Sequence, residues 1–213
     1  MALDTSTTLS NGTEIRARSV GSMDNIAYLI TPMGGRSVLI DAAADPGALT
    51  DLISAREVAT IITTHRHPDH WQALANLAEH TGAELIAGTP DAEAIAEGAG
   101  VTIDATVWEG DRVIVDDLDL QVIALPGHTP GGIALVLDTG ETDAVHVFTG
   151  DCLFPGGVGK THSPEEFTQL LDGVETKLFN VHDDDTVIHP GHGNPTTLGE
   201  ERGSLAEWRE RGW

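Results

Sequence analysis

In the first half of the chain, short hydrophobic runs alternate with amphipathic segments, and glycine, proline and aspartate separate them. Apolar runs bounded by turn residues predict buried strands, whereas apolar residues at helical spacing predict helices. The predicted strands are 25–31, 36–41, 59–65 and 83–88, and the predicted helices are 45–57, 69–82 and 91–98. The first two strands form a hairpin around a Pro-Met-Gly-Gly turn, and Gly82 ends the second helix.

The second half opens with β-rich sequence and ends with helical sequence. The β-rich segments are 106–115, 118–127, 131–139, 144–151 and 185–193, and the predicted helices are 163–175 and 198–213. The helix at 163 has a clear start, because Ser163 can cap it, Pro164 suits its first position and Glu166 can close a capping box. Since strands and helices form two blocks, we expect one α/β domain over 1–213, with two packed sheets and helices outside.

Composition narrows the class of protein. The chain has 213 residues, 40% of them hydrophobic, which suits a globular domain. A single cysteine, Cys152, excludes an internal disulfide. The start of the chain lacks a signal-peptide pattern and no apolar run has membrane length, so we expect a cytoplasmic protein. A net charge of −23 argues against nucleic acid and membrane partners, suits a high-salt cytoplasm and leaves the oligomeric state open.

The segment TTHRHPDHWQ, residues 63–72, places His65, His67, Asp69 and His70 directly after a buried strand. Imidazole nitrogens and carboxylate oxygens are good ligands for zinc, iron or manganese. Where a strand turns into a helix, these side chains can spread around a metal, with Pro68 delaying the helix so that Asp69 and His70 take its first positions. The alternative is a polar loop in which Asp69 caps the helix and the histidines are solvated.

Three later segments repeat this arrangement at other strand ends. LPGHTPGG places His128 after a strand, VFTGDCLF places Asp151 after another, and VIHPGHGNP places His192 after a third. Active sites of open sheets lie at such junctions. Four ligand-bearing junctions in one chain favour a metal site over four unrelated polar loops.

The order HxHxDH, PGHTPG, TGD and HPGHG resembles the metallo-β-lactamase-fold hydrolases, most closely the glyoxalase II-like branch. The resemblance covers about residues 22–195 and also includes the segments MDNIAYLI and GDCLFPGGVGKT. It implies a four-layer αββα sandwich made of two mixed sheets flanked by helices. It further implies a metal-dependent hydrolase that acts on an ester or thioester bond of a small molecule.

Transferred residue by residue, the resemblance implies two divalent metal ions, zinc first, with iron and manganese left open. The implied ligands are His65, His67 and His128 for one ion and Asp69, His70 and His192 for the other, with Asp151 bridging. The ions would lower the pKa of a bound water towards about 7 and polarise the substrate carbonyl. Asp69 would orient the resulting hydroxide as the catalytic carboxylate.

The substrate implied by the resemblance is a small acyl thioester. Lys160 matches the lysine of the family's thiol-binding loop, and His162 stands where an aromatic residue is expected, so both are candidate substrate contacts. The family's C-terminal glutathione-binding region has no counterpart in 198–213, which leaves the thiol carrier open. Two alternatives remain on the same fold: a lactonase, and a mononuclear iron persulfide dioxygenase that uses His65, His128 and Asp151. A non-catalytic binding module is the alternative from another class, and the complete ligand set argues against it.

Overall fold

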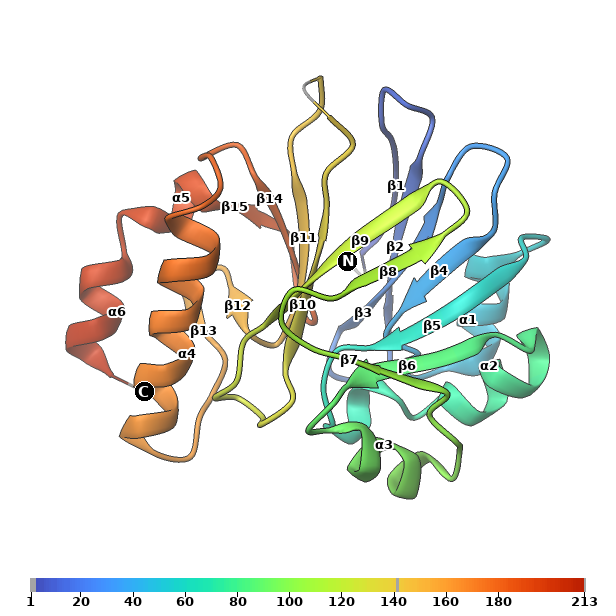
Figure 1. Ribbon diagram of the computed structural model, residues 1–213, viewed down its shortest axis with the longest axis horizontal. Helices are drawn as coiled ribbons and strands as arrows, with labels where there is room; N and C mark the ends of the chain where they lie inside the picture. The colour runs from blue at the N-terminus through green and yellow to red at the C-terminus, as the bar shows by residue number, and fades with distance from the viewer. Residues whose placement is uncertain (1–2, 141, 213) are drawn as a thin grey trace.

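The computed structural model describes residues 3–140 and 142–212 as two β-sheets packed face to face between two groups of helices. The larger sheet has the strand order β1-β2-β3-β4-β5-β6-β7, and the second has the order β15-β14-β11-β10-β9-β8. Figure 1 shows α1, α2 and α3 covering the outer side of the larger sheet, and α4, α5 and α6 covering the outer side of the second. The predicted four-layer sandwich of two mixed sheets is confirmed.

The first half of the chain builds the larger sheet and its helices. Its elements are β1 (Asp4–Thr8), β2 (Glu14–Val20), β3 (Asn25–Thr31), β4 (Ser37–Ile40), α1 (Pro46–Ile53), β5 (Val58–Thr63), α2 (Leu74–Thr81), β6 (Glu84–Gly88), α3 (Ala92–Ala99) and β7 (Ala105–Val107). Strands β1 to β4 are antiparallel, as the predicted hairpin requires, whereas β4 to β7 are parallel. The parallel part needs the helical crossovers, and these form the outer layer.

The second half builds the other sheet. Its elements are β8 (Arg112–Val115), β9 (Leu118–Ala124), β10 (Ile133–Leu137), β11 (His146–Gly150), β12 (Leu153–Phe154), β13 (Gly157–Val158), α4 (Pro164–Val174), a π-helical turn (Glu175–Phe179), β14 (Val187–Pro190), β15 (Thr196–Thr197), α5 (Leu198–Arg202) and α6 (Leu205–Arg211). Among the described helices, none combines the length and the apolar character needed to cross a membrane.

Three groups of buried side chains hold the layers together. The group between the sheets includes Ile30, Ile62, Leu135 and Phe148, all of which are fully enclosed. A second group joins the larger sheet to α1, α2 and α3, and a third joins the other sheet to α4, α5 and α6. Both faces of the central strands are therefore covered, so a functional site has to be formed by the loops at the ends of the strands.

Strand direction brings the ligand-bearing loops to one edge of the sandwich. In the larger sheet, β4 and β5 are parallel and end together. In the second sheet, β9 and β11 both pair antiparallel with β10 and thus run the same way, and β14 is parallel to β11. The loops that follow β5, β9, β11 and β14 are the four segments in which the sequence places ligands.

The predicted helix over 69–82 is wrong at its start. Pro68–His70 forms a separate 3-10 turn, and the α-helix begins only at Leu74. Backbone N–H groups of Gln72 and Ala73 donate to carbonyl oxygens in the loop after β4, so tertiary hydrogen bonds interrupt the helix. As a result, the His70 ring points into the protein.

Three further predictions need correction. The closing helix over 198–213 is two short helices, with a break at Gly203 and Ser204, and Trp213 lies outside the described residues. The β-rich segment 106–115 contributes β7 and β8 to different sheets. The helix over 45–57 ends at Ile53, because Ser54 has a left-handed φ of 56°. Strands β1 and β2 were not predicted from the sequence, because their residues are mostly polar.

Candidate metal centre

The loop after β5 carries four of the predicted ligands on a short, rigid path. Its His67 is extended, with φ −69° and ψ 137°, as expected for a residue before proline. Pro68 starts the 3-10 turn that contains Asp69 and His70. This geometry directs the side chains of His65 and His70 into the protein, where both are buried.

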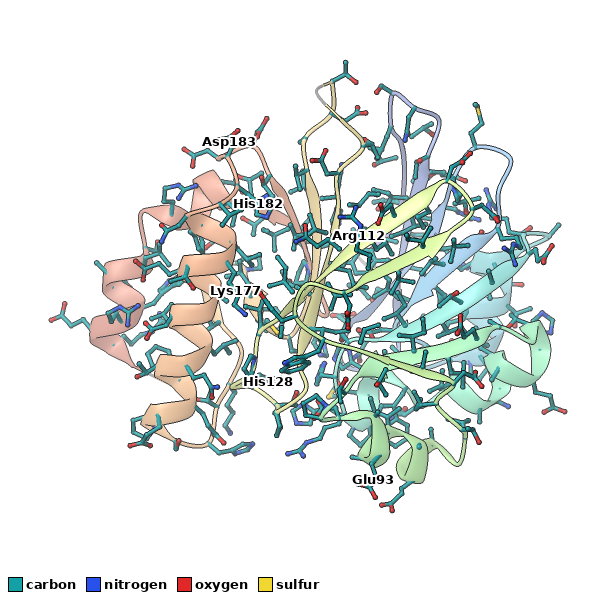
Figure 2. The ribbon with its side chains drawn as sticks, in the orientation of Figure 1. Glu93, Arg112, His128, Lys177, His182 and Asp183 are labelled. Atoms are coloured by element: carbon teal, nitrogen blue, oxygen red, sulfur yellow. The ribbon has the colours of Figure 1, made fainter. Side chains whose placement is uncertain are left out.

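The first cluster contains His65, His67 and His128. A ring nitrogen from each lies within 4.8 Å of the others, and His65 Nε2 is 3.1 Å from His67 Nδ1. His128 comes from the loop after β9, and Figure 2 shows it at the lower edge of the molecule, between the two halves. The structure thus brings the three residues of the first predicted ligand set together.

The second cluster contains Asp69, His70 and His192. His192 Nε2 is 3.2 Å from Asp69 Oδ2 and 3.3 Å from His70 Nε2. Asp151 lies between the clusters, because its Oδ1 is 3.3 Å from His70 Nε2 and its Oδ2 is 3.5 Å from His128 Nε2. All seven predicted ligands therefore meet at one edge of the sandwich, with Asp151 in reach of both sets.

Two buried atoms at this place have unmet bonding capacity. His128 Nε2 and Asp151 Oδ1 are enclosed and make no hydrogen bond within the described part of the chain. Leaving such atoms without a partner costs about 1–3 kcal/mol each, so a native fold retains them where something else binds them. Both point to the space between the clusters, and they are nitrogen and oxygen donors suited to a divalent cation. The residues present therefore fit two metal ions.

Two glycines allow the loops to approach this closely. A Cβ at Gly191 would lie 2.4 Å from Asp151 Oδ1 and 2.6 Å from His70 Cε1. A Cβ at Gly159 would lie 1.9 Å from the Asp151 carbonyl oxygen. Any side chain at either position would push apart the loops that carry the ligands.

Asp41, which the sequence analysis missed, holds His70 from behind. Its Oδ2 is 2.7 Å from His70 Nδ1, and its two oxygens accept hydrogen bonds from the backbone N–H and the hydroxyl of Thr64. Asp41 directly follows β4 and has a left-handed φ of 59°, a strained conformation that the buried contacts maintain. Because the Asp41 carboxylate occupies Nδ1, His70 presents Nε2 to the metal centre.

Asp91 is a second missed residue and connects two ligand loops. Its Oδ2 accepts a hydrogen bond from the backbone N–H of Arg66, which lies between His65 and His67, and its Oδ1 accepts one from Gly131, three residues after His128. Asp91 stands at the N-terminus of α3 but makes no capping bond there, and it is fully buried. The available sequence signal was an aspartate at the start of a predicted helix, but that is typical of an ordinary N-cap.

Opposite charges dominate the electrostatics of the second cluster. Burial lowers the pKa of His70, but the Asp41 and Asp151 carboxylates outweigh this and raise it to about 10. Burial raises the pKa of Asp151, but the His192 and His70 imidazoles beside its carboxylate hold it well below its ordinary value. Without a metal, the cluster therefore retains a proton on His70 beside an ionised Asp151, and cation binding would displace that proton.

The first cluster has the opposite tendency. Burial lowers the pKa of His65 to well below its ordinary value, and the neighbouring His70 adds to the effect. Burial and the nearby His128 also lower the pKa of His67. Both rings are therefore neutral near pH 7, which is the form that binds a metal ion.

The candidate substrate contacts lie on the loop after β13. The carbonyl oxygen of Lys160 accepts a hydrogen bond from His128 Nδ1 at 2.6 Å, so this loop orients the ring of the predicted metal ligand His128. The Lys160 side chain itself is exposed. His162 is also exposed, and its backbone N–H donates to Glu166 Oε2. The predicted capping box is therefore altered: Ser163 caps the helix, but Glu166 bonds one residue further back. The roles of Lys160 and His162 in substrate binding stay predictions.

Comparison with known proteins agrees with this architecture. Residues 25–201 match the Metallo-beta-lactamase superfamily. A relative from Haemophilus influenzae, named Hydroxyacylglutathione hydrolase GloC, is 33% identical over 184 residues, covering 76% of this chain and 84% of the relative. Two solved structures are also similar. TTHA1623 in a di-iron-bound form is 30% identical with a TM-score of 0.70, covering 86% of this chain and 95% of that chain. ETHE1 from Myxococcus xanthus is 26% identical with a TM-score of 0.73, covering 98% and 85%.

These similarities confirm the resemblance and the general class of activity predicted from the sequence, a metal-dependent hydrolase. They do not depend on one motif, since the matched region includes the loops after β5, β9, β11 and β14. The chain belongs to the metallo-β-lactamase superfamily.

Proposed function

We propose that this protein is a hydrolase with a two-metal centre that cleaves the acyl–sulfur bond of a small thioester. The observation that carries the proposal is the second cluster: Asp69, His70 and His192 are complete, close together and linked through Asp151 to the first cluster. A relative named Hydroxyacylglutathione hydrolase and a similar protein solved in a di-iron-bound form support this reading.

When bound, two divalent cations lower the pKa of water to about 7 and polarise a carbonyl oxygen. The chain supplies the positioning. Asp69 Oδ2 accepts a hydrogen bond from Asn25 Nδ2 at 2.9 Å, which fixes the carboxylate beside His192. Burial raises the pKa of Asp69, but the Asn25 hydrogen bond and the nearby His70 outweigh this and bring the pKa below its ordinary value, so Asp69 is ionised. An ionised, fixed carboxylate can accept a proton from the attacking water and aim its lone pair.

The reaction consumes one water. The water oxygen adds to the acyl carbon, the carbon–sulfur bond breaks, and the products are a carboxylic acid and a thiol that takes up a proton. In this proposal Lys160 binds an anionic group on the thiol carrier, and the support is that its side chain is exposed on the same loop whose backbone holds His128. His162 lies two residues further along this loop, where it can contact the same carrier.

The test is turnover of acyl thioesters by zinc-loaded protein, with glutathione, coenzyme A and small uncharged thiols as carriers. We expect hydrolysis of at least one thioester and about a 10²–10⁴-fold lower kcat for Asp69→Asn, the range measured for removal of a general base. Lys160→Met is expected to raise KM for a carrier with a carboxylate. Lys177→Met is the matched control, because Lys177 is the only other lysine and binds Glu109 and the Ala124 carbonyl.

Metal analysis separates this proposal from its competitors. Two zinc ions per chain with thioester hydrolysis support it, whereas one iron per chain with oxygen consumption on a persulfide would identify the dioxygenase alternative. Hydrolysis of lactones with no turnover of any thioester would identify a lactonase. His70→Ala separates the two-metal hydrolase from the dioxygenase, since a mononuclear centre of His65, His128 and Asp151 does not use the His70 ring as a ligand.

A further inference from the structure

A cavity of about 320 Å³ lies between the two sheets, apart from the metal centre. One wall is formed by Thr5 and Thr7 of β1 with Ile15 of β2, and the other by His146 and His189. His146 is the first residue of β11, and Asp151 follows the last residue of the same strand, so the cavity and the metal centre lie towards opposite ends of β11. Its volume is within the range of small-molecule sites.

The inner wall of the cavity contains a group of aromatic rings. His189 lies parallel to Phe148, with ring centroids 4.7 Å apart and planes at 15°. It is nearly coplanar with His146, at 5.2 Å and 18°, and the two imidazoles meet edge to edge through a hydrogen bond. Tyr28 meets the His189 ring edge-on at 5.3 Å. His146 and His189 both line the cavity, so a flat molecule within it can stack on this hydrogen-bonded pair of rings.

Only one ring nitrogen of each of these two histidines takes part in a hydrogen bond. His146 Nδ1 and His189 Nε2 share one hydrogen bond of 2.8 Å. For the other ring nitrogen of each residue, the described part of the chain supplies no hydrogen-bond partner. A hydroxyl or carbonyl group on a bound molecule would satisfy one of these nitrogens.

The cavity selects against charge. None of the described residues that line it is an aspartate, glutamate, lysine or arginine. Burial, together with the neighbouring His146, lowers the pKa of His189 to about 3, and burial also lowers that of His146, so both rings are neutral at pH 7. A charged ligand would be desolvated there without a partner.

We propose that this cavity is a binding site for a neutral, planar aromatic molecule that carries one hydroxyl or carbonyl group. The ring stacks on His146 against the apolar wall of β2, and the polar group bonds an imidazole nitrogen. The site is separate from the metal centre and does not rest on the proposed thioester hydrolysis.

The experiment uses 1-naphthol, which is neutral at pH 7, flat and fluorescent. We expect saturable binding to the zinc-loaded and the zinc-free protein alike, with shifts of the imidazole carbon-bound proton signals of His146 and His189 in NMR spectra. Absence of saturable binding, or binding that requires zinc and leaves these two signals unchanged, would overturn the proposal.

Strand β1 offers a matched pair of variants. Thr7 pairs with Ile15 and lines the cavity, whereas Thr8 pairs with Glu14 and points to the other face of the sheet, and both are exposed. Thr7→Trp should fill the entrance and weaken 1-naphthol binding about tenfold or more, the effect of losing one aromatic contact. Thr8→Trp should bind like the unmodified protein. Equal affinity of Thr7→Trp and the unmodified protein would place the ligand elsewhere and refute the site.

Discussion

Replacing Asp91 with asparagine should weaken metal binding at the first cluster without affecting the second. The Asp91 carboxylate joins the two loops that carry this cluster, accepting from the Arg66 N–H at 3.0 Å and from the Gly131 N–H at 3.0 Å. An asparagine amide has one oxygen and one NH₂ group, so it can accept only one of these bonds and must turn a donor towards the other N–H. The side-chain volume stays nearly the same, which isolates the hydrogen bond from packing.

The size of the effect follows from the lost bond. A hydrogen bond to a charged group contributes about 1.5–3 kcal/mol, and tenfold in affinity corresponds to about 1.4 kcal/mol. If the loss falls on the geometry of His67 and His128, the affinity of the first cluster should fall about 10–100-fold, the range for residues that support metal ligands. His70 is held by Asp41 and His192 by the Met23 carbonyl oxygen, so the second cluster should retain its affinity.

Zinc competition with a chromophoric chelator resolves the two binding steps. Asp104→Asn is the matched control, because Asp104 accepts one backbone hydrogen bond from Leu85 at 2.8 Å in a connection that carries no predicted ligand. It should lower thermal stability but leave both zinc affinities unchanged. If Asp91→Asn weakens both clusters equally, or weakens neither while lowering stability, then Asp91 supports the fold in general and the reasoning is refuted.

Three further predictions follow from the packing. Gly191→Ala should abolish binding of one metal ion or lower kcat about tenfold or more, because its Cβ would lie 2.4 Å from Asp151 Oδ1. Gly203→Ala, in open space, should leave both the metal content and kcat unchanged. His189 has a pKa of about 3 in the folded protein and near 6.5 in the unfolded chain, so its contribution to stability is present above pH 6.5 and is lost as pH falls towards 3. The loss amounts to up to about 1.4 kcal/mol per pH unit. The free energy of urea unfolding of His189→Phe should therefore depend less steeply on pH, and an unchanged slope would contradict this. Burial raises the pKa of the Cys152 thiol, so a disulfide reagent at pH 8 should label it only in denaturant, and rapid labelling of the folded protein would show an open core.

The ligand-bearing segments could be predicted because their information is local. His65, His67, Asp69 and His70 lie within six residues, and His128, Asp151 and His192 each follow a strand that short apolar runs already indicate. The same is true of the strands that deliver them, since a buried run needs only its own residues to be recognised. The choice of two packed sheets with helices outside followed from the order of these runs.

The tertiary structure decided what supports those ligands. Asp41 and Asp91 are ordinary aspartates in the sequence, at positions typical of a turn and of a helix cap. Asp41 reaches His70 across 29 residues, and Asp91 reaches Gly131 across 40, so neither contact has a local signal. The same cause moved the start of the helix predicted at 69 to Leu74, because hydrogen bonds to the loop after β4 outweigh local helix preference. Which residues can bind a metal ion is therefore set by short sequence segments. The orientation of each imidazole ring depends on buried hydrogen bonds between segments that only the packed sheets bring together.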